Sequence, residues 1–441
     1  MKRIIAVGLC VLLAATSLFA QGGSETKAPT LIEGHEPVVL TIWQTSRNTD
    51  DFTDAQEKAF LAEHPWITLN KVIKEGDPGN EFYQAVAAGT APDLINGSFT
   101  MMDMYISTGI VEPLNDYLAN WDDARNIDQA YMDMFSRDGK YYGVPLEVLP
   151  MLFGYNKALF EAAGLDYAPR TWDEALEFAR ILDDDENKVC GYATLAAEWT
   201  EWFFQYYVWQ AGGDLTVQNE DGTIELTFTD PAVIEAAKYY QALAGENLLQ
   251  SDRTLKLGDL LEQFSMGKIA MMPFATDWVM DMANRGMDLD DLGLALPPAG
   301  PSGKSATAIA GTCYVINAKT TQAKKDAAWE YISWYLSGEQ RAAYYENAAS
   351  KGAIAPVTIP RTDMAITDFV EFPAEYTEVL SGVGDIGRLE FYGKATFGAY
   401  VDRAVQKILS NPTTDPMKEF AEVQKQAEAE ALDNFNATNK R

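Results

Sequence analysis

The chain has 441 residues, of which 47% are hydrophobic and 22% are charged, and this length exceeds what one hydrophobic core usually organises, so two lobes or domains of roughly 200 residues are expected. Thirty-four lysines and arginines against 65 aspartates and glutamates give a net charge of −31. Such a charge repels phosphate backbones and anionic lipid headgroups, which makes nucleic acid and anionic membrane surfaces poor candidates for partners.

Residues 1–20 have the pattern of a secretory signal peptide. Two basic residues precede an apolar stretch at 4–15, and small residues end at Ala20. We predict cleavage after Ala20 and a soluble periplasmic product without a lipid, because Cys10 lies inside the apolar stretch and not at the processing point. Residues 21–36 lack periodicity and are rich in Gly, Ser, Thr and Pro, which indicates a flexible leader.

The folded part begins with alternating strands and helices. An apolar, β-branched run at 38–43 predicts a strand, 54–60 a helix and 67–72 a second strand. A helix at 81–88, ended by a glycine, then precedes a strand at 92–95. This alternation indicates an α/β domain.

Several helix starts further along the chain have clear capping signals. Thr171 and Ser337 each begin a capping-box pattern, and Asp230 and Asp415 each precede a proline at the first helical position. Further strands are expected at 148–155, 268–273, 292–296 and 309–316, with a turn-rich surface loop at 297–303.

Motifs for catalysis, cofactors and metals are weak. The chain contains two histidines, His35 and His64, and neither lies in a catalytic or zinc-binding motif. Residues 382–387 match GxGxxG, but no strand precedes them and no helix follows, so we interpret them as a glycine-rich loop. Cys190 and Cys313 lie in apolar segments. They are either two buried free thiols or one long-range disulfide. We expect no catalytic residue, no metal and no cofactor.

Aromatic residues recur on one face of a helix near residue 200. Trp199, Trp202, Phe203, Tyr206 and Trp209 follow helical spacing. Such a face is more often core than ligand site, and we interpret Tyr206 and Trp209 as core. The helix start also has acidic neighbours, and aromatic faces beside carboxylates suit a sugar, whose C–H faces stack while its hydroxyls form hydrogen bonds.

Six segments carry a resemblance to a known family. The sequence GYNKALFEAAGL at 154–165, followed by PRTWDEAL at 169–176, resembles family 1 extracellular solute-binding proteins, the periplasmic sugar-capture subunits of ABC importers. The other matching segments follow in the family's order from about residue 38 to the C-terminus, at 87–93, 209–213, 264–272 and 328–332.

The resemblance implies an α/β, two-lobed periplasmic-binding-protein fold, a type II clamp. Each lobe is then a sheet flanked by helices, and hinge strands cross between the lobes. The expected N-lobe comprises 37–147 plus 294–318, and the expected C-lobe 148–293 plus 319–441. The implied function is capture of a sugar or oligosaccharide between the lobes and delivery to the permease subunits of an ABC transporter, by a protein that we expect to be monomeric.

The resemblance also implies site residues at the ends of strands and helices. Trp278, with Asp277 beside it as a hydroxyl acceptor, is the expected stacking platform for the sugar, and a place in the C-lobe core is the alternative for Trp278. The expected N-lobe residues are Gln44, Ser46, Arg47, Asn96, Ser98, Phe99, Glu147 and Thr312, and the expected C-lobe residues are Trp202, Asp277, Trp278 and Phe397.

Two other functions remain open from the sequence. A secreted carbohydrate-active enzyme would need two carboxylates across a scissile bond, for which Glu147 with Glu198 or Glu201 is the best choice. A receptor for another solute is the second alternative, because one fold serves many functions. Arg47 and Arg388 suit an anionic ligand such as a glycerol phosphodiester, whereas a polyamine requires carboxylates and aromatics.

Overall fold

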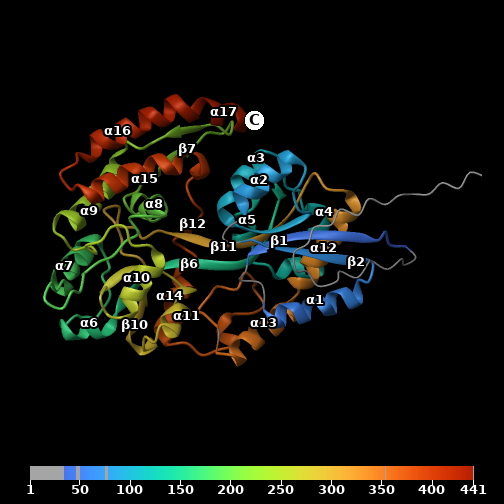
Figure 1. Cartoon of the computed structure of the whole chain (residues 1–441), viewed down its shortest axis with the longest axis horizontal. Coiled ribbons are helices and arrows are strands. Elements are labelled where there is room, and N and C mark those ends of the chain that lie inside the picture. The colour runs from blue at the N-terminus through green and yellow to red at the C-terminus, as the bar shows by residue number, and fades with distance from the viewer. Residues whose placement is uncertain (1–33, 46–49, 75–77, 353, 441) are drawn as a thin grey trace, which may run out of the picture.

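One mixed sheet runs through both lobes of the molecule (Figure 1). The computed structural model describes residues 34–440 except 46–49, 75–77 and 353. In the N-lobe the strand order is β2, β1, β3, β11, β6; β1 is parallel to β2 and β3, and β11 is antiparallel to β3 and β6. These strands span Val38–Thr45 (β1), Ile67–Lys74 (β2), Leu94–Ser98 (β3), Val144–Asn156 (β6) and Thr307–Ile316 (β11).

The long strand β6 continues from the N-lobe into the C-lobe. Its second half lies between β9 (Met271–Ala275) and β10 (Leu292–Ala295), and it is antiparallel to both. The start of β11 pairs with the short strand β12 (Gly387–Arg388). Strands β6 and β11 therefore both cross between the lobes, as the expected hinge requires.

Helices cover both faces of the N-lobe sheet. On one face, here called the α1 face, α1 (Asp51–Glu63) and α12 (Gln322–Tyr335) pack on apolar residues of β1 and β11. On the opposite face, here called the α3 face, α2 (Gly79–Ala88) and α3 (Met102–Ser107) do the same (Figure 1). Shorter elements complete this lobe: α4 (Asn115–Leu118), α5 (Gln129–Asp133), β4 (Ser136–Arg137) and β5 (Lys140–Tyr141).

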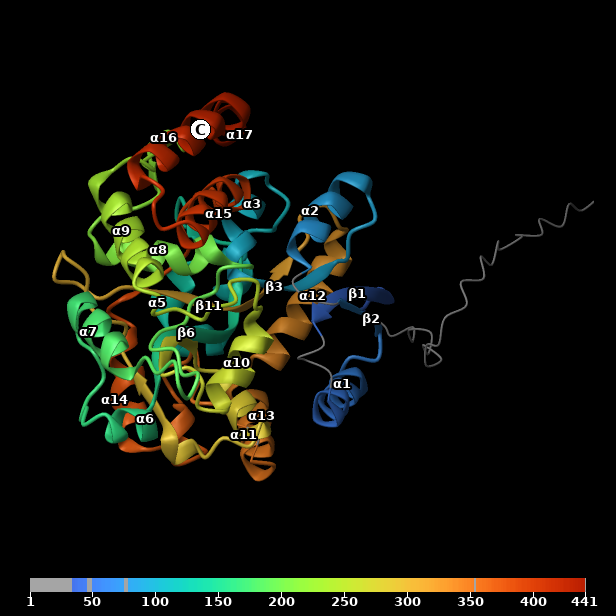
Figure 2. The ribbon, with the colours of Figure 1, turned by 60° about the vertical axis from the view of Figure 1, so that its left-hand side comes forward.

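Two lobe boundaries differ from the sequence-based limits. Helix α12 lies beside β1, where Ala328, Trp329 and Ile332 join the N-lobe core (Figure 2), although residues after 318 were expected in the C-lobe. Strand β10, expected to begin the return to the N-lobe at residue 294, pairs with the C-lobe half of β6 instead. The reason is burial: the apolar side of α12 covers a sheet face that would otherwise be open to water.

A third connection between the lobes follows α13 (Gly338–Ser350), which packs against α1. Residues 354–366 run beside the first half of β6, where Thr358 pairs with Val148, and contribute to a small apolar cluster with Tyr345. The chain then enters α14 (Ala374–Val383), which packs on β10 and β6. The GxGxxG match at 382–387 joins α14 to β12, so it lacks the strand-turn-helix context of a dinucleotide site.

The C-lobe core is helical and aromatic. Helix α8 (Thr200–Gln210) packs against α9 (Pro231–Gly245) and α15 (Lys394–Ser410). Tyr206 and Trp209 are 2% and 3% exposed, which confirms them as core residues. The remaining elements are α6 (Lys157–Ala162), α7 (Trp172–Leu182), β7 (Thr216–Gln218), β8 (Ile224–Leu226), α10 (Leu257–Ser265), α11 (Trp278–Asn284), α16 (Pro416–Ala427) and α17 (Asp433–Asn439).

The capping signals read from the sequence begin the expected helices. The Thr171 hydroxyl accepts a hydrogen bond from the Glu174 amide at 3.2 Å, and Asp415 accepts one from the Lys418 amide at 3.2 Å. Ser337 caps α13 in the same way. The side chain of Asp230 makes no capping hydrogen bond, and Pro231 alone marks the start of α9.

Both cysteines of the described chain are free thiols. Cys313 is buried and Cys190 is half-buried, so the disulfide alternative is wrong. No helix among the described residues is long and apolar enough to span a membrane. The expected signal peptide at 1–20 and nearly all of the leader at 21–36 lie outside the described residues.

Candidate functional site

The C-terminal ends of β1 and β3 point from the N-lobe toward the C-lobe. Strand β6 runs from the N-lobe into the C-lobe, and β11 is antiparallel to β6. Because β3 is antiparallel to β11 and parallel to β1, both strands run in the direction of β6. Ligands of open α/β sheets bind at such strand ends.

Five of the residues expected in the site lie together on this edge. The strand register places Ser98 opposite Thr312, and Thr312 opposite Glu147. Because side chains alternate between faces, Gln44 and Asn96 lie on the same α1 face of the sheet as these three residues. We call Gln44, Asn96, Ser98, Thr312 and Glu147 the polar edge.

Parts of the polar edge are buried without hydrogen bonds. Asn96 is 0% exposed, and neither its amide nitrogen nor its amide oxygen has a partner among the described residues; the same is true of the Thr312 hydroxyl. Such a group costs about 1–3 kcal/mol when it stays unsatisfied. Natural proteins keep few of them, and a bound ligand or water is a common reason. Ser98 differs, because its hydroxyl accepts a hydrogen bond from the Thr100 amide.

A cavity of about 310 Å³ lies between the lobes beside Glu147. We call it the hinge cavity. Glu147 and Leu149 of the hinge strand β6 line it, together with Asp277 and Asp281 at the start of α11 and Tyr344 of α13. Residues from both lobes and from the third connection therefore meet at one cavity, and hinge motion changes the distances between its walls.

Tyr344 is held in this wall by a neighbouring cation. The Arg341 guanidinium is 4% exposed and lies 4.4 Å from the ring centre of Tyr344 and 5.0 Å from that of Tyr345. Burial, together with the nearby Glu147 carboxylate, raises the pKa of Tyr344 well above its ordinary value. The Tyr344 hydroxyl therefore stays protonated and can donate a hydrogen bond at neutral pH.

The adjacent residues Asp277 and Trp278 have different environments. Asp277 lines the hinge cavity. Trp278 is 7% exposed, belongs to the C-lobe core and packs edge-to-face on Phe274 at 5.4 Å. Trp278 therefore has the position in the C-lobe core that was the alternative to a stacking platform. Asp277, the expected acceptor for sugar hydroxyls, does lie at a cavity.

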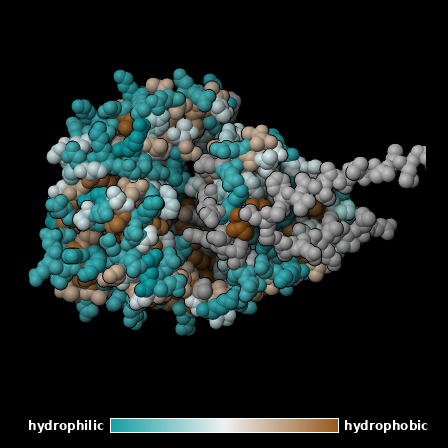
Figure 3. Space-filling model, in the orientation of Figure 1, coloured by the Kyte–Doolittle hydropathy of each residue, from teal (hydrophilic) through white to brown (hydrophobic). Residues whose placement is uncertain are grey.

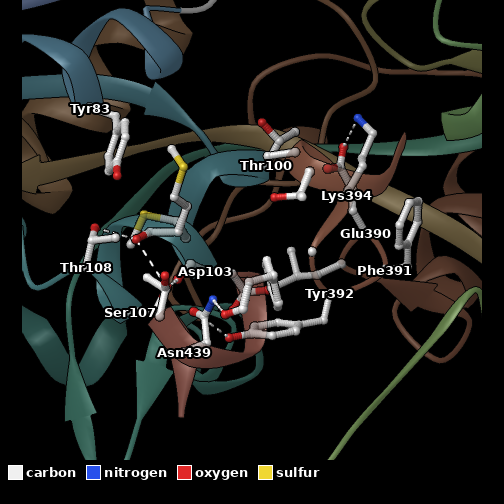
Figure 4. Close-up of a pocket in the computed structure, with 18 of the residues that line it drawn as sticks. Tyr83, Thr100, Asp103, Ser107, Thr108, Glu390, Phe391, Tyr392, Lys394 and Asn439 are labelled. Atoms are coloured by element: carbon white, nitrogen blue, oxygen red, sulfur yellow. Dashed lines mark hydrogen bonds and ion pairs between the residues drawn. The ribbon is translucent and has the colours of Figure 1, made fainter. Parts of the chain in front are cut away.

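A second cavity, of about 280 Å³, lies between α3 and the C-terminal helix α17 (Figure 4). We call it the C-terminal cavity. Phe99 and Thr100, which follow β3, form part of its N-lobe wall, and Phe99 is 4% exposed. Residues 389–396 and α17 form the C-lobe wall. Among the expected site residues that the structure describes, Phe99 is the one that lines it.

Trp202 contacts this second cavity through a charged cluster. It packs edge-to-face on Tyr206 at 5.3 Å and lies beside the Glu390 carboxylate. The Lys394 amine lies 3.1 Å from Glu390 and 3.6 Å from Glu201. Burial raises the pKa of the Glu390 carboxyl, and the Lys394 charge opposes this effect.

Phe397 lines neither cavity. It is 0% exposed and packs on Phe435 at 5.3 Å in the C-lobe core. Ser46 and Arg47 lie outside the described residues, so their places in the expected site stay predictions. Sequence reasoning missed Tyr344, because a single tyrosine on a polar helix has no pattern that distinguishes a cavity wall from an ordinary surface.

The charged residues that line both cavities are mainly acidic. Glu147, Asp277 and Asp281 line the hinge cavity; Asp103, Glu390 and Glu430 line the other, with Lys394 as the cation among its lining residues. Arg388 was a candidate contact for an anionic ligand. It is paired with Asp214 at 2.6 Å and stacked on Trp209. The outer surface of the C-lobe in Figure 3 is mostly hydrophilic.

Comparisons with known proteins fit this geometry. The family model described as bacterial extracellular solute-binding protein matches residues 45–342, more than half of the chain. A binding protein of Brucella abortus (strain 2308) is 30% identical over 317 residues, which cover 70% of this chain and 74% of that protein. The diacetylchitobiose binding protein DasA of Streptomyces coelicolor is 22% identical over 358 residues, 79% of this chain and 80% of DasA.

A solved structure has the same fold. It is an ABC transporter solute binding protein of Thermotoga lettingae TMO bound with alpha-D-tagatose, with a TM-score of 0.73 at 21% identity. The likeness covers 89% of this chain and 99% of that chain. The two-lobed α/β fold expected from the sequence motifs is thereby confirmed.

Proposed function

The chain belongs to the bacterial extracellular solute-binding protein family, and from this premise we propose that it captures a sugar or oligosaccharide between its lobes and delivers it to the permease of an ABC transporter. Relatives support the sugar class: DasA is a diacetylchitobiose binding protein, and the Thermotoga protein binds tagatose. Because the family is extracellular, the protein is exported.

The hinge cavity is the observation that carries this proposal. Glu147, Asp277 and Asp281 offer acceptors for sugar hydroxyls, and Tyr344 offers an aromatic ring and a donor. The volume of about 310 Å³ lies at the lower end of the range of small-molecule sites. A ligand that touches walls from both lobes stabilises the closed form, because closure adds contacts that the open form lacks.

The polar edge extends this binding surface along the strand ends. The buried amide of Asn96 and hydroxyl of Thr312 have no partner among the described residues, so ligand hydroxyls that reach them gain hydrogen bonds without breaking protein ones. Amides and hydroxyls both donate and accept, as sugar hydroxyls do. A neutral polyhydroxylated ligand matches this surface better than an ion does.

The two alternatives have less support. A glycosidase needs two carboxyl groups about 5–9.5 Å apart across a scissile bond, but Glu198 and Glu201 line neither described cavity. Glu198 accepts a hydrogen bond from the Leu257 amide at the start of α10, and Glu201 pairs with Lys394. An anionic solute such as a glycerol phosphodiester meets acidic walls, which repel it.

The test is calorimetry with the purified mature protein across neutral sugars and oligosaccharides, glycerol phosphodiesters and polyamines. We expect saturable binding of at least one neutral sugar, and no release of reducing sugar from it over time. Turnover of an oligosaccharide would establish an enzyme, and binding confined to phosphodiesters or polyamines would replace the sugar with another solute. Solution scattering checks closure: the radius of gyration should fall when the ligand saturates the protein.

Export and assembly belong to the same proposal. Cleavage after Ala20 leaves a mature chain that begins at Gln21, without acylation, and the mature protein acts as a monomer in the periplasm. The intact mass of the exported protein and its mass in solution measure these two properties. A chain that carries a diacylglycerol mass, or a stable dimer, would contradict them.

A further inference from the structure

Both histidines of the chain lie against one tryptophan of the N-lobe. The chain has two histidines in 441 residues. His35, at the base of the leader, stacks on the ring of Trp66 with 3.8 Å between the ring centres and 23° between the ring planes. His64, directly after α1, meets the same ring edge-to-face at 5.2 Å. The proposed capture of a ligand uses neither of these titratable rings.

These side chains lie at the opposite end of the sheet from the polar edge. We call His35, His64, Trp66 and Glu330 of α12 the histidine cluster. The Val38 amide donates to the Trp66 carbonyl at 2.9 Å, directly before β1 and β2 begin. The elements that meet here, α1, α12 and β2, lie together in the N-lobe (Figure 1). The histidine cluster therefore closes the start of the sheet, where the leader joins the folded chain.

The contact between His64 and Glu330 requires a proton. The His64 ring nitrogen Nδ1 lies 2.9 Å from the Phe60 carbonyl oxygen, and because a carbonyl can only accept, Nδ1 donates. The other ring nitrogen, Nε2, lies 3.5 Å from the Glu330 carboxylate oxygen Oε2. Without a further proton, a nitrogen lone pair and a carboxylate oxygen face each other. A proton on Nε2 replaces this repulsion with an attraction between opposite charges.

Glu330 has no other partner that would replace this charge. Its buried oxygen Oε2 has no hydrogen-bond partner among the described residues. Burial raises the pKa of the Glu330 carboxyl, and the charges of His64 and His35 oppose this effect. A protonated His35 also places a cation over the face of Trp66, which attracts it. Protonated histidines therefore hold the base of the leader on the N-lobe more firmly than neutral ones.

The other charged neighbours of the histidine cluster are acidic. They are Glu36 beside His35, Glu63 beside His64, and Asp326 one turn before Glu330 on α12. Strand β2 carries no charged residue before Lys71. These carboxylates attract a protonated imidazole and give nothing to a neutral one.

We propose that the histidine cluster is a pH-sensitive anchor, which fixes the base of the leader to the N-lobe in acid and releases it at alkaline pH. Histidine is the side chain whose charge ordinarily changes between pH 5 and 8. Loss of the protons removes the attraction to Glu330 and the cation over Trp66 together, because both contacts depend on imidazolium charge. An exported protein meets the external pH directly, so the pH outside the cell decides where its ordered chain begins.

Magnetic resonance of the two histidines tests the anchor. In the mature chain, prepared without a histidine tag and labelled with carbon-13 at histidine, His35 and His64 give the two imidazole signals. EDTA keeps metal ions off the rings. At pH 5.5 we expect the His35 Cε1–H signal upfield of its random-coil position, because this ring lies over Trp66. At pH 8 the signal should return toward the random-coil position.

Hydrogen exchange measures the same release in the backbone. The Val38 amide, which is bonded to the Trp66 carbonyl, should exchange about tenfold faster at pH 8 than at pH 5.5 after correction for the intrinsic effect of pH. Glu330→Gln keeps the side-chain shape and removes the anion, so it should abolish most of this difference. Glu346→Gln changes an exposed carboxylate of α13 and should keep the difference. His35→Ala changes an exposed residue and should exchange at pH 5.5 as wild type does at pH 8.

The outcomes separate the anchor from the proposed function. If the corrected exchange of Val38 is independent of pH, or depends on pH equally in wild type and Glu330→Gln, the anchor is not a switch. If the His35 signal stays upfield at pH 8, the stack persists without charge and the proposal is wrong. Calorimetry should give wild type and His35→Ala the same ligand affinity, because the histidine cluster lies away from the polar edge. Failure of the anchor therefore leaves the proposed function standing.

Discussion

Asp93 lies directly before strand β3 and Asn96 lies in the middle of it, three residues later, and both side chains are buried. Asp93, 4% exposed, accepts hydrogen bonds from the Thr41 amide at 2.9 Å and the Thr320 hydroxyl at 2.5 Å, and pairs with Lys324 at 3.0 Å. Asn96, 0% exposed, has no hydrogen bond among the described residues. A buried polar group with all its partners stabilises the fold, whereas one without partners costs stability and is retained for another reason.

The same contrast appears across the lobes. In the C-lobe the aromatic residues of α8 form a packed core, and the Tyr192 and Tyr207 hydroxyls bond each other. In the N-lobe, polar residues occupy the strand ends that point at the other lobe. Two of the buried groups that have no hydrogen-bond partner among the described residues, the Asn96 amide and the Thr312 hydroxyl, lie on this polar edge, and the following predictions test whether they serve a ligand.

The largest effect on stability is expected from a substitution of Trp278, the residue that the sequence analysis expected to be a stacking platform. Trp278→Ala should lower the free energy of unfolding by about 3–5 kcal/mol, because it leaves a cavity beside Phe274 in the C-lobe core. Urea unfolding measures the loss, and calorimetry should find ligand affinity unchanged in the folded fraction. If the variant is as stable as wild type and binds the ligand more weakly, Trp278 contacts the ligand and the core assignment is wrong.

Asp93→Ala should cost nearly as much. It leaves the Thr41 amide without its acceptor and Lys324 without its partner; Lys324 is 36% exposed, so water compensates part of the loss, and we expect about 2–3 kcal/mol. Ligand affinity should not change, because Asp93 lies at the start of β3, away from the polar edge. Unfolding and calorimetry on one sample measure both. A loss of affinity without a loss of stability would contradict the contrast.

Asn96→Leu should have the opposite signature. The change removes two unsatisfied polar atoms from a fully buried site, so the free energy of unfolding should stay within about 1 kcal/mol of wild type or rise. Ligand affinity should fall by about tenfold or more, because the amide no longer meets ligand hydroxyls. An unchanged affinity in this folded variant would remove Asn96 from the binding surface.

Two threonines on β11 offer a matched comparison of smaller size. The Thr307 hydroxyl donates to the Met151 carbonyl at 2.8 Å, whereas the buried Thr312 hydroxyl has no partner among the described residues. Thr307→Val should destabilise by about 1 kcal/mol, and Thr312→Val should be neutral or stabilising. Only Thr312→Val should weaken ligand binding. Equal effects of the two changes on stability would contradict the assignment of the Thr312 hydroxyl to a ligand.

The smallest expected effect is the pH dependence that comes from Asp123, another fully partnered carboxylate. It accepts hydrogen bonds from Arg361, from the Asn126 amide group and from the Gly338 backbone, and these partners hold its pKa below the ordinary value of 3.8 against the effect of burial. A lowered pKa contributes stability that is present above about pH 3.8 and is lost as the pH falls through the lower folded value.

Asp123→Asn should therefore flatten part of the loss of stability below pH 4. The measurement is urea unfolding between pH 3 and 6, with Asp385→Asn as the control, since Asp385 is an exposed carboxylate. Equal pH profiles for Asp123→Asn and wild type would show that the Arg361 contact makes no measurable contribution.

Local patterns predicted much of the fold because their causes are local. Short apolar runs located β1, β2 and β3 within a few residues, and side-chain caps located the starts of α7 and α16. Strand ends are also visible in a sequence, which is why Gln44 and Asn96 could be predicted to lie at the edge of the sheet that faces the other lobe. These features depend on neighbours within about four residues.

The features that the sequence did not predict depend on how distant segments of the chain pack together. Consecutive side chains after β9 go to opposite environments, so the sequence could not decide which of Asp277 and Trp278 meets the cavity and which enters the core. The register of β11 against β3 and β6 decided that Thr312, Ser98 and Glu147 share one face. Helix α17 is held beside the C-terminal cavity by the hydrogen bond from the Ile224 amide to Asn436, two residues that are far apart in the chain.

By itself, the amino-acid sequence determined the α/β class, the two-lobed family fold and the core positions of Tyr206 and Trp209, because periodicity, caps and family motifs are properties of short segments. The tertiary structure alone decided that α12 packs with the N-lobe, that the two thiols are free and that acidic residues from both lobes line the cavities. Those outcomes depend on which distant surfaces bury each other, and burial is a property of the whole chain.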